Sequence, residues 1–122
     1  MMKAKSLWLA LVLALSASAL AQDDVAAAKK ELAKVEKQYV AAKASYTKKP
    51  KDAKLKKAYI EATVKFGTAT MTNASLSPRE KYAPALRLYR EALKLDPTNK
   101  EAANNKKMIE DIYVQMGRPI PK

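Results

Sequence analysis

The sequence predicts an all-α protein of about four antiparallel helices, preceded by a cleavable signal peptide. Three observations predict this class. Strong helix formers (Ala, Lys, Leu and Glu) dominate the chain, and only two residues are glycine. Apolar residues recur every three or four positions over long stretches, as on one face of an amphipathic helix. Prolines with capping residues beside them divide these stretches near positions 50, 77 and 97.

Residues 1–21 have the three regions of a secretory signal peptide. Lys3 and Lys5 supply the positive charge, and residues 7–15 form an apolar run of suitable length. The small residues Ala19 and Ala21 match the pattern that a signal peptidase accepts, so the expected cut follows Ala21. We therefore expect a periplasmic or secreted protein with no membrane span after cleavage. An uncleaved N-terminal anchor is the alternative.

The first two helices follow from their apolar seams. Residues 23–48 carry a seam with alternating spacings of three and four, and Pro50 ends the helix. Asp52 is an N-cap candidate for a second helix that reaches about Ala74. Gly67 lies inside that helix, where a close helix crossing, a kink or an early stop would each explain it. The seam of the first helix consists of Val25, Ala28, Leu32, Val35, Tyr39, Ala42 and Tyr46.

A third helical segment opens with a capping box. Ser77 fits the N-cap, and Glu80 fits its reciprocal partner three residues later. Pro84 lies too deep for an undisturbed helix. The sequence therefore predicts a short turn over 78–82, a break or kink, and a regular helix over 83–95.

The fourth helix is expected to start at a second capping box, formed by Thr98 and Glu101 after the break at Pro97. Gly117 is a suitable C-terminal stop, and the proline-rich tail over 118–122 is expected to be non-helical. The positions expected to be buried are Ala102, Asn105 or Lys106, Ile109, Ile112, Tyr113 and Met116.

The residue inventory excludes most catalytic chemistry. The chain has no histidine and no cysteine, so the usual zinc and copper ligands, imidazole bases and thiol nucleophiles are missing. The carboxylate pairs Asp23-Asp24 and Glu110-Asp111 are interpreted as solvated. Four tyrosines on the seams are expected to pack in the core with their hydroxyls at its rim, and ligand stacking is the alternative: Tyr39, Tyr46, Tyr59 and Tyr89. We expect no enzyme, no metal and no cofactor.

The net charge of +12 is concentrated in the first half of the chain. Export disfavours nucleic acid as the counterpart, which leaves an anionic envelope surface or an acidic protein. A lysine face that only keeps the protein soluble is the alternative. If the charge has a function, we place it at a cluster around the first interhelical turn: Lys48, Lys49, Lys51, Lys54, Lys56 and Lys57.

A motif in the third helix resembles the tetratricopeptide repeat (TPR). Ala85, Tyr89, Ala92 and Pro97 have the A-x3-F/Y-x2-A-x4-P spacing of the second helix of such a repeat and the turn after it. The match covers mainly residues 85–113, and the first-helix signature of the repeat is missing. The resemblance implies a helix-pair array over 22–117 that binds other proteins through a groove.

We therefore expect an exported, non-enzymatic, TPR-like interaction or scaffold module whose partner is another envelope or secreted protein. The alternative is a peripheral binder of an anionic envelope surface, lipid or cell-wall polymer, through the lysine-rich helices. The helix over 23–48 is expected to fold back on the second and third helices. Self-association through its seam is the other use of that surface.

Overall fold

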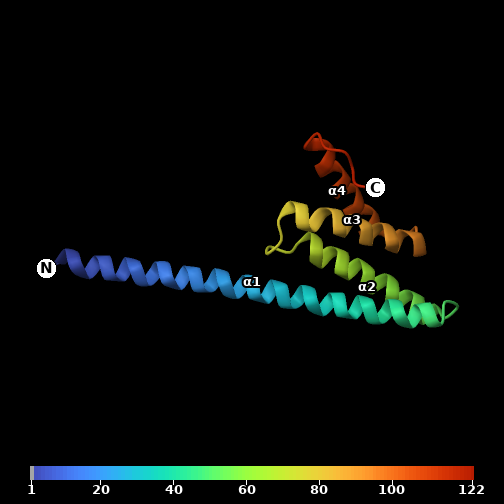
Figure 1. The fold of residues 1–122 in the computed structure, drawn as a ribbon, viewed down its shortest axis with the longest axis horizontal. Helices are drawn as coiled ribbons and strands as arrows, with labels where there is room; N and C mark the ends of the chain where they lie inside the picture. The colour runs from blue at the N-terminus through green and yellow to red at the C-terminus, as the bar shows by residue number, and fades with distance from the viewer. Residues whose placement is uncertain (1) are drawn as a thin grey trace.

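Residues 2–122 contain four helices, and each packs against the next one along the sequence (Figure 1). The computed structural model describes the backbone of residues 2–122 and the side chains of residues 22–122. The helices are α1 (Met2–Lys48), α2 (Ala53–Met71), α3 (Pro78–Leu95) and α4 (Lys100–Gln115). The predicted all-α class with four helices is confirmed. The predicted signal peptide over 1–21 lies outside the described side chains.

Helices α1 and α2 form an antiparallel hairpin with the predicted turn. Helix α1 ends at Lys48, and the Asp52 carboxylate caps α2 by accepting two backbone hydrogen bonds at 2.9 and 3.1 Å. The seam of α1 packs along α2 from Ala28 onward, with Val35 1% exposed, whereas Val25 at the start of the predicted seam is 39% exposed. Within the described residues, no helix is long and apolar enough to cross a membrane.

Helix α2 ends at Met71, earlier than the predicted end near Ala74. The cause is Asn73, whose buried side chain forms hydrogen bonds with the backbone of α1 and with the backbone of the α2–α3 connection. Its Nδ2 donates to the carbonyl oxygen of Ala28 on α1 at 3.0 Å, and its Oδ1 accepts from the N–H of Ser75 at 2.9 Å. An asparagine bonded in this way competes with continuation of the helix. The bond to Ala28 also ties the α2–α3 connection to α1.

Gly67 marks a close crossing of α2 and α3, which decides among the three explanations that the sequence allows. A Cβ atom at this position would lie 3.0 Å from Cε1 of Tyr89. Tyr89 is fully buried, and its hydroxyl lies 2.9 Å from Thr68 Oγ1 and 3.2 Å from Asn105 Nδ2. The missing side chain at Gly67 therefore makes room for Tyr89, the largest fully buried side chain among the described residues.

Helix α3 is continuous over Pro78–Leu95 with Pro84 inside it, so neither the short turn predicted over 78–82 nor a break at Pro84 occurs. The predicted capping box is confirmed, with Glu80 accepting from the N–H of Ser77 at 2.8 Å and Ser77 accepting from that of Glu80 at 3.4 Å. Pro84 lacks the N–H that would bond to the carbonyl oxygen of Glu80. Because Glu80 is exposed, water can solvate that oxygen, and the two buried residues after Pro84 anchor the helix.

The predicted capping box of Thr98 and Glu101 is wrong, because Asn99 is the N-cap of α4. Asn99 Oδ1 accepts from the N–H of Ala102 at 2.9 Å. The Thr98 hydroxyl instead donates to Asp96 Oδ1 at 2.6 Å. The Glu101 carboxylate accepts from a threonine hydroxyl of α2 at 3.1 Å, so it joins two helices rather than closing a cap.

The end of α4 follows the prediction at Gly117 but not at Met116. Gly117 has a positive φ of 66°, and two hydrogen bonds of 3.0 Å close the helix in a Schellman motif. Met116, expected to be buried, is 47% exposed. The reason is that α4 packs mainly on α3, so its last turn extends past the core.

The hydrophobic core lies where α2, α3 and α4 meet. Helix α3 contributes most of it, since one face of that helix is closed on both sides by its neighbours. Complete burial of a Leu or Ile side chain contributes about 1.5–3 kcal/mol, so this face holds the fold together. The core consists of Val64, Ala85, Leu86, Tyr89, Ala92, Ala102 and Ile109.

Candidate functional site

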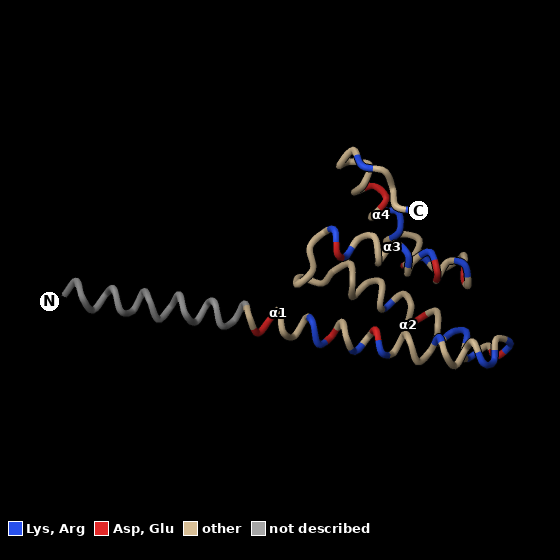
Figure 2. The backbone as a smooth tube through the Cα atoms, in the orientation of Figure 1, with Lys and Arg blue, Asp and Glu red and all other residues tan. Residues whose placement is uncertain are grey.

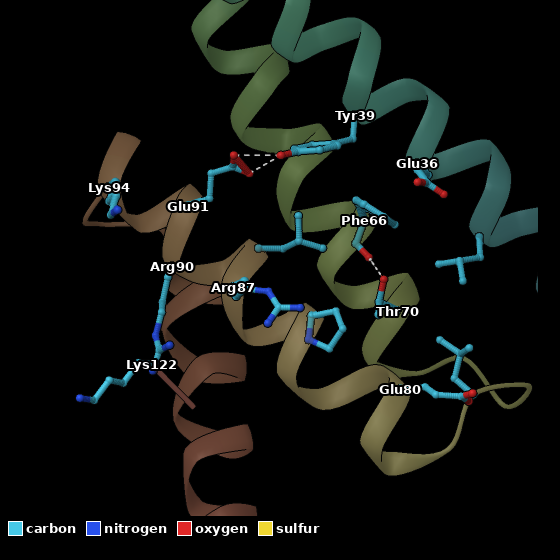
Figure 3. A pocket seen from close by; sticks show the side chains of 14 residues that line it. Glu36, Tyr39, Phe66, Thr70, Glu80, Arg87, Arg90, Glu91, Lys94 and Lys122 are labelled. Atoms are coloured by element: carbon cyan, nitrogen blue, oxygen red, sulfur yellow. Dashed lines mark hydrogen bonds between the residues drawn. The ribbon is translucent and has the colours of Figure 1, made fainter. Parts of the chain in front are cut away.

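An open groove lies between α1 and α3, with α2 as its floor, and we call it the α1–α3 groove (Figure 3). Its volume is about 810 Å³, within the range of protein ligand sites. Leu32 of α1, Phe66 of α2 and Leu88 of α3 line it, and Leu76 from the α2–α3 connection lies at one end. The groove therefore offers an apolar surface to which three helices contribute.

A hydrogen-bonded cluster around Glu91 joins the two walls of the groove, and we call Glu91, Tyr39, Tyr59 and Lys43 the Glu91 cluster. Tyr39 on α1 donates to both carboxylate oxygens, at 2.6 and 2.9 Å. Tyr59 on α2 donates to Oε1 at 2.8 Å, and Lys43 on α1 forms an ion pair with it at 2.9 Å. Figure 3 shows the Tyr39 hydroxyl reaching across to Glu91. Three helices are thus fastened to one side chain.

The charges of the Glu91 cluster are fixed at neutral pH. Burial raises the pKa of Glu91, but the hydrogen bonds from Tyr39, Lys43 and Tyr59 outweigh it, so the pKa lies below its ordinary value. Burial and the bond to Glu91 raise the pKa of both tyrosines. The bond to Glu91 also raises the pKa of Lys43. No group in the cluster titrates near pH 7, so its arrangement favours a structural role over acid–base catalysis.

The α3 wall of the groove carries a row of positive charges, Arg87, Arg90 and Lys94, which we call the α3 cation row. Spacings of three and four residues place these side chains on one face of the helix. Lys122, near the C-terminus, also lines the groove, on the side of Arg90 and Lys94. The ion pairs among the described side chains are Lys43–Glu91 and Lys106–Glu110, so the α3 cation row has no carboxylate partner there.

Two carboxylates line the groove away from the α3 cation row. Glu36 projects from α1, the opposite wall, and Glu80 lies in the first turn of α3. Both are exposed. The groove therefore has a basic edge along the later turns of α3 and acidic groups elsewhere on its rim, which is a polarised charge distribution.

The six lysines singled out in the sequence lie together around the α1–α2 turn, and we call them the hairpin lysines (Figure 2). All six are exposed, and none is in an ion pair among the described side chains. The nearby Asp52 carboxylate is engaged in capping α2. They do not line the α1–α3 groove, so they are separate from the α3 cation row.

The TPR-like positions occupy the core rather than the groove. Ala85, Tyr89 and Ala92 are fully buried on the face of α3 that meets α2 and α4. Pro97 is exposed in the turn directly after the α3 C-cap, Asp96. The spacing of Ala85, Tyr89 and Ala92 places all three on the buried face of α3, where the two small alanines permit close contact with neighbouring helices beside the tyrosine ring.

The two carboxylate pairs differ in their surroundings. Asp23 and Asp24 are exposed, as expected for solvated groups. Glu110 is instead half-buried and pairs with Lys106 at 3.0 Å, one turn earlier on α4. Its neighbour Asp111 is exposed. In the part of the chain with described side chains, no three potential metal ligands lie close together.

Sequence reasoning missed Glu91 and the α3 cation row. The signal for Glu91 was indirect: seam tyrosines with hydroxyls at a core rim need a polar partner, and Tyr39 and Tyr59 share one. The signal for the cations was the spacing of Arg87, Arg90 and Lys94 on one helix face.

Comparison of the chain with protein-family models, with curated proteins and with solved structures finds no match. The four-helix architecture is therefore shown by the structure alone.

Proposed function

We propose that this chain is an exported, non-enzymatic helical module that binds a segment of another protein in the α1–α3 groove. The observation that carries the proposal is the groove: an open apolar surface to which three helices contribute, with charged residues on its rim. Such a surface is characteristic of a binding site rather than of a closed core.

The TPR-like motif supports the proposal. TPR proteins bind other proteins through a groove, and the motif residues Ala85, Tyr89 and Ala92 have the small-large-small packing that positions such helices. In this chain the groove is lined by three successive helices, α1, α2 and α3.

The N-terminal 21 residues support an envelope or extracellular setting, because their pattern is that of a secretory signal peptide. In that setting the partner is another envelope or secreted protein. The absence of histidine and cysteine from the sequence fits a binding role, since it removes the commonest catalytic groups.

Affinity capture from envelope extract, with three forms of the full chain, tests the proposal. Leu76→Trp adds bulk to the groove, whereas Val114→Trp adds the same ring to an exposed position on α4. We expect the unaltered chain and V114W to retain a protein that L76W loses, with thermal melts showing that all three are folded. An identical set of captured proteins for the three forms would refute the groove as the binding site.

A second candidate function is attachment to an anionic envelope surface through the hairpin lysines. The observation that favours it is six exposed lysines that form no ion pair among the described side chains, close to the Asp52 carboxylate that already caps α2. Phosphatidylglycerol vesicles and an anionic cell-wall polymer test this by co-sedimentation. Binding that falls steeply with salt and is lost in K48Q/K51Q/K54Q supports it; binding that the variant retains excludes it.

A further inference from the structure

The geometry points to an amphipathic α-helix as the occupant of the groove, with carboxylates along the edge that faces the α3 cation row. This inference rests on the proposed function and specifies the chemistry of the partner segment. Three observations support it: the shape of the groove, the position of its charges, and the pairing of the ionised Glu91 with Lys43.

The shape favours a helix over an extended strand. No strand occurs among residues 2–122, so the groove offers no sheet edge with which a strand could pair. Glu80 and Lys94 both line the groove and lie on the same helix, which places them roughly 21 Å apart along its axis at 1.5 Å per residue. A helix of about fourteen residues spans that length.

The charges fix which side of that helix is acidic. Arg87, Arg90 and Lys94 follow one another along α3 at intervals of roughly 4.5 and 6 Å. Carboxylates spaced three and four residues apart on a partner helix have the same intervals. The opposite wall carries Glu36, which would repel a carboxylate placed against α1. The complementary ligand therefore has its acidic edge toward α3.

Glu91 does not cancel the α3 cation row, although it lies between Arg90 and Lys94 in the sequence. Its two carboxylate oxygens accept from Tyr39 and Tyr59 and pair with Lys43. The Glu91 cluster thus uses a cation of α1 to satisfy the one acid in this part of α3, which leaves the three residues of the α3 cation row available to a ligand.

The test is fluorescence anisotropy of the full chain with two labelled peptides of about eighteen residues and identical composition. In the first, Leu repeats at helical spacing with Glu along one flank, and Gln and Ala fill the rest. In the second, the same residues are permuted so that the helical pattern is lost. We expect the first peptide to bind at least about tenfold more tightly than the second. Equal binding of the two peptides would overturn the inference.

Matched charge reversals separate recognition by the groove from general attraction to a basic protein. R87E/R90E/K94E alters the groove, and K48E/K51E/K54E makes the same change in net charge on the hairpin lysines. We expect the first variant to lose about tenfold or more in affinity for the patterned peptide and the second to lose much less. Equal losses would contradict the inference. If the triple variant does not fold, R87E/K94E, which changes only exposed residues, is compared with K48E/K51E, which makes the same change in net charge.

Two further results distinguish failure of this inference from failure of the proposed function. If L76W loses its captured protein but R87E/K94E retains it, the groove binds a protein segment and the acidic chemistry is wrong. If sedimentation shows that the unaltered chain self-associates and R87E/K94E does not, the occupant is a second copy of this chain; acidic groups then face the α3 cation row, but the proposal that another protein is the partner fails.

Discussion

The hydroxyl of Tyr39 on α1 lies 2.6 Å from a carboxylate oxygen of Glu91 on α3, although the two residues are 52 positions apart in the sequence. This hydrogen bond spans the groove that we propose as the binding site. Helices α1 and α3 both pack on α2, so the Glu91 cluster sets how the two walls stand relative to each other. The stability of the groove and the integrity of this cluster are therefore linked.

Replacing Glu91 with glutamine should destabilise the fold. Glu91→Gln keeps the size of the side chain but removes the charge that Tyr39, Tyr59 and Lys43 share. We expect the free energy of unfolding to fall by about 1–3 kcal/mol, the usual cost of losing hydrogen bonds to a charged group. Denaturant titration measures it. The matched control Glu31→Gln, at an exposed position of α1, should change stability by less than about 0.5 kcal/mol.

The lowered pKa of Glu91 predicts that the free energy of unfolding depends on pH. The folded pKa of Glu91 is lowered below the ordinary value of 4.5, so the folded state favours the ionised form. Its contribution to stability is fully present above pH 4.5 and is lost as the pH falls through the lower folded value. Stability measured from pH 6 to pH 2 should therefore fall less steeply for Glu91→Gln than for the unaltered chain. Parallel curves would show that Glu91 has no such role.

Substitution at the start of α4 should identify the N-cap. Asn99→Ala removes the oxygen that accepts from the N–H of Ala102 and should cost about 0.5–2 kcal/mol. Thr98→Ala removes only an exposed bond to Asp96 and should cost less than about 0.5 kcal/mol. Thermal or denaturant melts of the two variants provide the comparison. A larger loss for Thr98→Ala would restore the capping box that the sequence predicted.

Overpacking at Ala92 should be costly because that residue is fully buried in the core. Ala92→Leu adds three carbon atoms to a closed contact and should lower stability by about 1–3 kcal/mol. Ala103→Leu introduces the same side chain at an exposed position of α4, where we expect little change. Equal melting temperatures for the two variants would mean that Ala92 is not packed against a neighbouring helix.

Features with local causes were predictable from the sequence. Asp52 and Ser77 cap their helices through neighbouring residues, so a short window of sequence contains the whole interaction. The assignment of the N-cap of α4 to Thr98 failed because both Thr98 and the adjacent Asn99 can cap a helix. The Thr98 hydroxyl is bonded to Asp96, and Asn99 is the cap. The end of α2 was misplaced because Asn73 bonds to α1, which is distant in the sequence.

The candidate site depends on contacts between residues far apart in the chain. Glu91 meets Tyr39 and Tyr59 across separations of 52 and 32 residues. Periodicity places each tyrosine on an apolar seam, but it does not say which residue of another helix faces its hydroxyl. The groove and its polarised rim become visible only when α1, α2 and α3 are brought together.

Site-specific photocrosslinking in exporting cells tests directly whether a partner binds in the α1–α3 groove. A photoreactive phenylalanine analogue is placed at Glu36 in the groove or at Val114 on the outer face of α4. We predict a discrete crosslinked adduct from position 36 and none from position 114. Adducts of equal yield from both positions, or from position 114 alone, would contradict the claim.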